Sequence, residues 1–286
     1  MNVAYPYQRF QDWFTQQWVI LQGRKIDPAT ESWLVGPFGG LNGIGEEFIL
    51  QLAEKENLVV HRKVKSTGLL SSVYELDLSE SDLAVLSKEV IAFYEQTGRY
   101  KLSFRVKWKG GFKFFGGLVN SLFSNRIHQL YIPTKNIDGS EVLDSEIITL
   151  NALNSNEPVF TIWFRRLKTS GKVIFSGVYG TCTLPSGKKC VKAVFPLPNG
   201  NATVILEPIV QQNGALALVS SGDKFGDPGF YFLLKDSKNN YWAQYIRSFR
   251  DRLTINVLED YLSAEQILTL WGREVLRINY KIDREE

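Results

Sequence analysis

The spacing of hydrophobic residues changes along the chain from a helical to an alternating pattern. In the first half, apolar residues recur every three to four positions in several stretches, which predicts amphipathic helices. The longest of these stretches has Ser79 as a candidate N-cap and Gly98 as a candidate stop, and the first presents a row of aromatic residues. The predicted helices cover residues 10–18, 46–55, 79–98 and, interrupted by glycines, 112–123.

Strict alternation begins with residues 101–109. Leu102, Phe104 and Val106 point to one side, and the residues between them are Ser103 or basic. This pattern predicts a half-buried strand with a basic outer face. A further strand is predicted over residues 126–132, before Pro133.

From residue 144 onward the chain is predicted to be almost all strand. Apolar and polar residues alternate in most segments, and turn sequences follow one another at 185–187, 199–200 and 213–214. These signals predict an antiparallel meander with strands over residues 172–182, 189–198, 201–212 and 215–222.

The turns also predict which residues face each other. The first turn places Cys182 opposite Cys190, and the second, built on Asn199-Gly200, places Lys192 opposite Glu207. The second strand of the meander carries apolar residues on both faces, which predicts that it is covered on both sides. Such a strand is typical of a sandwich, a closed barrel or a strongly curved sheet.

Together these elements predict an α+β fold in which N-terminal helices pack on a large, curved antiparallel β-sheet of meander, sandwich or barrel form. No linker-like or low-complexity segment divides the chain. We therefore expect one integrated domain over residues 1–286. Within it, residues 1–143 form a helix-rich part with the basic strand, and residues 144–286 form the antiparallel part.

Composition narrows the class of protein. Aromatic residues make up 13% of the 286 residues and are spread along the whole chain, which suits an apolar pocket. The sequence lacks a secretory signal pattern and a long apolar run, and its two Cys suggest no disulfide framework. These features predict a cytoplasmic protein.

One segment departs from the mild net charge of +3. Residues 96–137 contain eight Lys or Arg and no Asp or Glu, with aromatic residues between them. The basic segment 99–113 is thus a candidate contact with an anionic membrane surface. The small net charge does not favour nucleic acid as a partner.

Residues with recognisable cofactor or metal chemistry are few. Neither His61 nor His128 has other ligand residues at metal-binding spacing. The glycine-rich stretch 36–45 lacks both the third glycine of a dinucleotide fingerprint and a Gly-Lys-Ser/Thr sequence. We expect no metal and no cofactor.

The predicted loop at residues 220–229 is rich in acidic residues and glycines. Asp223 and Asp227 lie beside glycines and are followed by Tyr231. Such residues are typical of turns, but paired acids can also act as general acid and base, here with an Arg from residues 247–252. The sequence does not decide whether the protein is an enzyme, and its catalytic residues are unknown.

Four strings resemble blocks of an uncharacterised bacterial protein family that has no assigned activity. They are FYEQTGRY (93–100), SNRIHQL (124–130), CVKAVFPLPNGNAT (190–203) and FGDPGFYF (225–232). The resemblance covers most of the chain and favours a single domain. It implies no catalytic residues.

The leading hypothesis from these patterns is a protein that binds a hydrophobic or aromatic, lipid-like small molecule in a pocket between the sheet and the helices. The alternatives are an enzyme that uses Asp223 or Asp227 with an Arg, and a peripheral protein of anionic membranes. The candidate ligand-binding residues are His128, Arg165, Lys192, Asp223, Asp227 and Tyr231.

Overall fold

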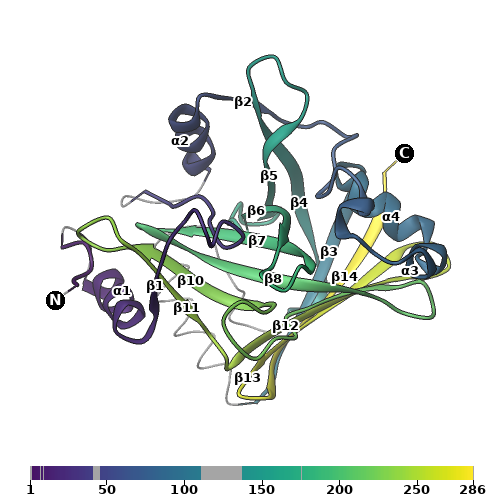
Figure 1. The fold of residues 1–286 in the computed structure, drawn as a ribbon. Helices are drawn as coiled ribbons and strands as arrows, with labels where there is room; N and C mark the ends of the chain where they lie inside the picture. The colour runs from purple at the N-terminus through teal and green to yellow at the C-terminus, as the bar shows by residue number, and fades with distance from the viewer. Residues whose placement is uncertain are drawn as a thin grey trace.

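The computed structural model describes residues 2–6, 8, 10–40, 46–110, 137–174 and 176–285, which form antiparallel strands with a few short helices (Figure 1). The helices are α1 (Phe10–Gln22), α2 (Glu47–Glu56), η1 (Val73–Leu76), α3 (Glu80–Val85), α4 (Lys88–Glu95) and η2 (Thr97–Arg99). The strands are β1 (Arg24–Ile26), β2 (Leu58–His61), β3 (Tyr100–Trp108), β4 (Ile137–Ala152), β5 (Pro158–Leu167), β6 (Gly177–Thr183), β7 (Lys189–Leu197), β8 (Gly200–Val210), β9 (Leu216–Val219), β10 (Gly229–Lys235), β11 (Tyr241–Tyr245), β12 (Phe249–Val257), β13 (Leu262–Leu270) and β14 (Arg273–Arg284).

Ten of these strands close into a barrel. Their order is β8-β7-β6-β5-β4-β3-β14-β13-β12-β9, and β9 pairs again with β8. Closure leaves no unpaired edge within the ring, apart from the lengths of strand that extend beyond it. The basic strand predicted over 101–109 is β3, and it lies between β4 and β14.

Strand β8 belongs to two sheets at once. Its second half pairs with β9 in the barrel, whereas its first half pairs with β10, which continues to β11 and β1. This side sheet lies on the left in Figure 1, with α1 beside β11. The chain therefore leaves the barrel after β9, builds the hairpin β10–β11 and returns to the barrel with β12.

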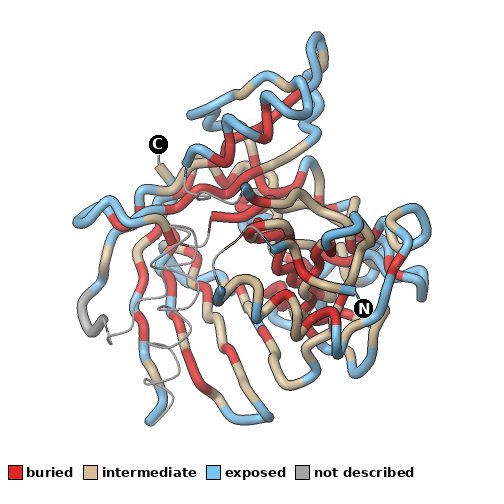
Figure 2. The backbone as a smooth tube through the Cα atoms, turned by 90° about the vertical axis from the view of Figure 1, so that its left-hand side faces the viewer, coloured by how far each residue is buried: buried red, intermediate tan, exposed pale blue. Residues whose placement is uncertain are grey.

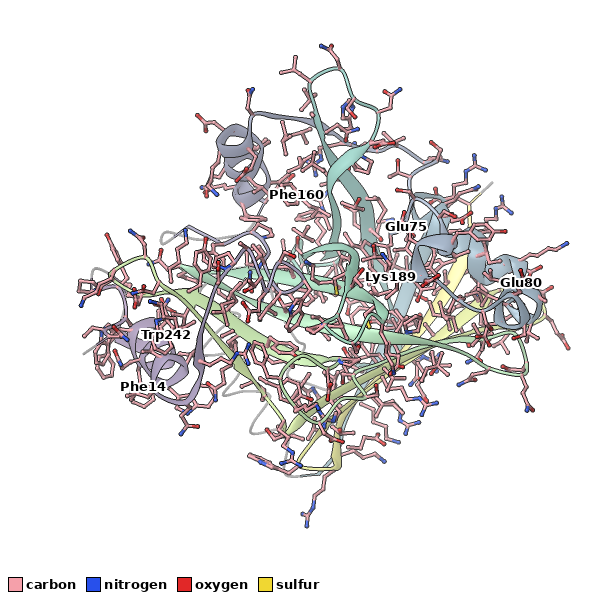
Figure 3. All side chains as sticks on the ribbon, viewed as in Figure 1. Phe14, Glu75, Glu80, Phe160, Lys189 and Trp242 are labelled. Atoms are coloured by element: carbon pink, nitrogen blue, oxygen red, sulfur yellow. The ribbon has the colours of Figure 1, made fainter. Side chains whose placement is uncertain are left out.

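A second extension comes from the hairpin β4–β5, which rises beyond the ring in Figure 1. Strand β2 pairs with β4, and α2 covers this end of the hairpin. Phe160 of β5 packs into the apolar cluster that α2 shares with the sheet (Figure 3).

Alternation along the strands decides which side chains fill the barrel. On β3, Leu102, Phe104 and Val106 are buried. The basic residues that alternate with them, Lys101, Arg105 and Lys107, are exposed, as predicted. Burial follows the barrel wall and the layers packed on it (Figure 2). The predicted large antiparallel sheet is thus confirmed in its barrel form. The helices are short, so the α+β description overstates their share.

The meander is confirmed, and one of its two predicted registers is wrong. Cys182 lies opposite Cys190 as expected. Lys192, however, lies opposite Ile205 instead of Glu207. The central turn residues are Pro198 and Asn199, since Leu197 pairs with Gly200 and Asn199 has φ of 53°. Proline fits the first central position and asparagine tolerates the positive φ of the second.

The predicted helix over 79–98 is divided. Leu86 is extended and ends α3, and the Ser87 hydroxyl then accepts a hydrogen bond from the Glu89 N–H and starts α4. The Ser87 N–H donates to the Gly214 carbonyl, outside either helix. A capping serine with a tertiary partner therefore overrides a continuous helical pattern.

The other predicted helices fare differently. Those over 10–18 and 46–55 are confirmed as α1 and α2. The aromatic row of α1 is divided between core and surface. Phe10 and Phe14 are exposed, and Figure 3 labels Phe14. Trp13 and Trp18 pack on the side sheet. The elements predicted over 112–123 and 126–132, and with them His128, lie outside the described residues.

Candidate functional site

The barrel encloses a cavity of about 80 Å³. Its lining comes from every strand of the ring except β4, and Phe93 and Tyr94 of α4 cover part of it together with Leu69 and Leu70. Most of the lining is aliphatic or aromatic. Five polar side chains on the described strands interrupt it, and we call them the interior cluster: Arg165, Tyr179, Asp251, Gln266 and Tyr280.

Arg165 is a buried cation on β5. Its guanidinium lies 3.9 Å from the centre of the Trp163 ring and donates a hydrogen bond of 3.0 Å to the Tyr179 hydroxyl. Trp163 is itself fixed, because its indole N–H donates to the Ser145 hydroxyl at 2.8 Å. Side chains from β4, β5 and β6 thus orient the charge within the cavity lining.

Asp251 on β12 is the acid of the interior cluster. Both carboxylate oxygens accept hydrogen bonds from the Gln266 amide on β13, at 3.1 and 2.9 Å. Burial raises the pKa of Asp251 to about 7, against the smaller opposing effect of the Gln266 hydrogen bond. The carboxyl group therefore changes protonation near neutral pH.

The neighbours of Asp251 hold it in place through its backbone. The Ser220 hydroxyl accepts from the Asp251 N–H at 2.6 Å, and the Ser220 N–H donates to the Asp251 carbonyl at 2.9 Å. On the cavity side, the Tyr280 hydroxyl donates to the side-chain amide oxygen Oε1 of Gln266 at 3.4 Å. The acid is thus part of a network that crosses β12, β13 and β14.

Tyr94 adds a hydroxyl to the cavity from the helical side. The residue is 2% exposed, and within the described part of the chain its hydroxyl has no hydrogen-bond partner. Burial raises the pKa of Tyr94, and nearby Tyr179 raises it further. A buried hydroxyl without a partner costs free energy unless something in the cavity pairs with it.

A different polar group lies on the opposite face of the same barrel wall. Lys192 of β7 points away from the cavity, and its ammonium donates to the carbonyls of Trp33 and Val35 at 3.2 and 3.0 Å. Burial lowers the pKa of Lys192. Glu207, its predicted partner, instead forms an ion pair of 2.5 Å with Lys188.

Tyr231 lies in the same outer layer and is fully buried beside Trp33 and Phe225. Its hydroxyl donates to the Asp227 carbonyl at 2.5 Å and accepts from the Gly226 N–H at 3.1 Å. We call Lys192, Asp227 and Tyr231 the outer cluster.

The acids of the loop are engaged separately. One Asp227 carboxylate oxygen accepts from the N–H groups of Asp223 and Lys224, which closes the turn. The Asp223 side chain is 79% exposed and pairs with Arg250 at 3.1 Å, so the predicted acid–Arg neighbour exists. Among the described residues, no contact brings the Asp223 and Asp227 carboxylates together at one cavity.

Of the predicted site residues, the structure places Arg165 in the cavity lining and Lys192, Asp223, Asp227 and Tyr231 outside the barrel. Asp251 was missed, although the sequence carried a signal for it. Leu253 and Ile255 lie two and four positions after Asp251 on the same strand. Side chains at every second position of a strand point to one side, so all three share the inward face.

Two further observations concern metal ligands and membrane-spanning helices. Within the described ranges, no group of His, Cys, Asp and Glu side chains is placed to hold a metal ion. None of the helices that the structure describes has the length and apolar character needed to cross a bilayer.

Comparison with known proteins gives one informative similarity. The chain is 28% identical over 245 residues to a Bacillus subtilis (strain 168) protein named "Uncharacterized membrane protein YndJ". The match covers 85% of this chain and 42% of that relative, so the chain spans less than half the relative's length. No family model and no solved structure matches the chain. The resemblance to an uncharacterised bacterial family is therefore confirmed.

Proposed function

We propose that the barrel is a binding compartment for a small, mostly apolar molecule that carries one polar group. The observation that carries this proposal is the cavity, whose mostly apolar lining holds the polar side chains of the interior cluster. An apolar pocket with a few convergent polar groups is the usual form of a small-molecule site. The hydroxyl of Tyr94, which has no hydrogen-bond partner among the described residues, supports a ligand in the same place.

Cavity size restricts the ligand. A volume of about 80 Å³ is roughly half that of the ~150 Å³ apolar cavity known to take benzene. The cavity therefore suits a body of a few carbon atoms. A lipid-like ligand would place only the end of its chain here.

The test uses small neutral probes, 1-butanol and butanamide, and follows the indole N–H signal of Trp163 by NMR. We expect a saturable shift in the wild-type protein. Ala264→Leu, which fills the cavity, should abolish it, whereas Ser263→Leu on the other face of β13 should not. Probes that leave the Trp163 signal unchanged in the wild type would rule the proposal out.

A second candidate function is contact with an anionic membrane surface. Trp271 is 67% exposed at the turn between β13 and β14, and Lys107, Lys109, Arg247 and Arg273 are exposed around this end of the barrel. An exposed Trp among cations suits the interfacial region of an anionic bilayer. The relative's name as a membrane protein favours this candidate.

Vesicle sedimentation tests the second candidate. Binding to vesicles with anionic lipid should exceed binding to neutral vesicles and fall with added salt. Trp271→Ala and the double variant Lys107→Gln/Lys109→Gln should weaken it, and Tyr74→Ala, at another exposed aromatic, serves as the control. Equal binding to both kinds of vesicle would refute this function. The cytoplasmic location stays a prediction.

A further inference from the structure

The cavity lining is unbalanced in charge. Among the described residues that line it, Arg165 and Asp251 are those whose side chains carry a formal charge near neutral pH. The guanidinium stays protonated, whereas Asp251 has a pKa of about 7. With Asp251 protonated, these described lining residues together carry a charge of +1, and with Asp251 ionised their charges sum to zero.

A positive charge in an apolar cavity favours an anion, because low local polarity strengthens the attraction and little water competes. Arg165 sits among groups that could complete such a site. The Tyr179 hydroxyl accepts from its guanidinium and keeps its own proton to donate. The Tyr94 hydroxyl, which lacks a partner among the described residues, is a second donor.

We infer that the ligand is a small monoanion, with a carboxylate or similar oxyanion held by Arg165 and the tyrosine hydroxyls, and that it binds when Asp251 carries its proton. This inference rests on the proposed function and names the class of ligand. The apolar remainder of the cavity takes a body of a few carbon atoms.

Every element around Asp251 bears on the proton dependence. Gln266 of β13 bonds its carboxyl group, and Ser220 bonds its backbone. Arg165 on β5, Tyr179 on β6 and Tyr280 on β14 line the same cavity, and both tyrosines have pKa values raised mainly by burial. Asp251 is thus the group among these that changes charge near pH 7.

The charge of Asp251 determines the direction in which anion affinity changes with pH. Below pH 7 Asp251 is neutral and the anion meets a net positive lining. Above pH 7 the ionised carboxylate opposes the anion, so affinity falls by up to about tenfold per pH unit. A neutral ligand of the same shape has no such dependence.

The experiment compares butanoate, butanamide and butylamine by the Trp163 NMR signal at pH 6 and pH 8.5. We expect butanoate to bind at least tenfold more tightly than butanamide at pH 6, to lose at least tenfold at pH 8.5, and butylamine not to bind. If butanamide binds and butanoate is no better, the inference fails while the proposed function stands. If no probe binds, including 1-butanol, both fail.

Variants separate charge from packing. Arg165→Gln should remove the preference for butanoate and Arg165→Lys should retain most of it, with Arg105→Gln on the exposed face of β3 as the matched control. Asp251→Asn should keep butanoate binding and remove its pH dependence. A pH dependence unchanged in Asp251→Asn would overturn the role of that residue.

Tyr94→Phe distinguishes a ligand contact from a structural one. Because the hydroxyl has no partner among the described residues, its removal should leave the thermal midpoint unchanged or higher. Butanoate affinity should nevertheless fall several-fold. A lower thermal midpoint with unchanged affinity would contradict the contact.

Discussion

The interior cluster and the outer cluster lie on opposite faces of one barrel wall, and they use their polar groups differently. In the outer cluster, Lys192, Asp227 and Tyr231 bind backbone groups: carbonyls of residues 33 and 35, and the N–H and carbonyl groups of one turn. In the interior cluster, Arg165 and Asp251 bind other side chains.

This difference separates a structural polar group from a candidate site. Backbone partners are fixed by the fold, so side chains that satisfy them hold segments together. Side chains that bind one another in a cavity lining face the space that a ligand would occupy. Burial alone does not distinguish the two, since each cluster combines buried with partly buried side chains.

The largest effect expected is on the outer side. Tyr231→Ala removes a fully buried ring from the packing around Trp33 and Phe225 and should lower the free energy of unfolding by about 3–5 kcal/mol. Tyr231→Phe should cost only about 1 kcal/mol, for the lost hydroxyl. Urea denaturation measures both, and a loss below 1 kcal/mol for the alanine variant would contradict a structural role.

The next effect belongs to Asp251. Between about pH 4 and about pH 7 the carboxyl is protonated in the folded protein and ionised in the unfolded chain. The folded state therefore holds more protons, and stability falls as pH rises through this window, by an amount of the order of 2–4 kcal/mol. Asp251→Asn should remove this fall in urea denaturation series from pH 4 to pH 8.5. Parallel profiles for wild type and variant would count against the assignment.

Lys192→Met tests the hold on the N-terminal segment. Two hydrogen bonds from a charged donor to backbone carbonyls are lost, and the expected cost is about 1.5–3 kcal/mol. Lys188→Met, at an exposed ion pair, is the control and should cost less than about 1 kcal/mol. Cavity binding should be unchanged in both. A change in butanoate affinity in Lys192→Met would contradict a purely structural role for Lys192.

The smallest effect is expected at Asp223. Its pair with Arg250 is exposed, so Asp223→Asn should change stability by less than about 0.5 kcal/mol and leave ligand binding unaltered. This outcome would leave the loop without a part in binding. Reduced binding would instead support the hypothesis of an enzyme that uses the loop acids.

Local signals predicted most of the second half of the chain. Turn residues placed the hairpins of the meander, and alternation identified the two faces of β3, because both depend on short stretches of sequence. The register between β7 and β8 was wrong by two residues. Either Pro198-Asn199 or Asn199-Gly200 is an acceptable two-residue turn, and only the tertiary structure selects between them.

The site was harder to predict, since its residues are single polar positions on separate strands. Arg165 and Asp251 lie 86 positions apart in the numbering and meet only because the sheet closes. The loop at 220–229 is prominent in sequence because turns need glycine and aspartate. Prominence of that kind marks a change of direction in the chain.

Closure of the barrel has a consequence for how the protein folds. The seam joins β3 to β14, where Tyr100 pairs with Arg284 and Trp108 with Leu276. Pairing strands so distant in sequence closes a large loop of chain. The entropy lost in closing that loop slows folding. The hairpins of the meander can form early from neighbouring residues. The cavity is complete only when β14 pairs with β3, so ligand binding requires this long-range contact.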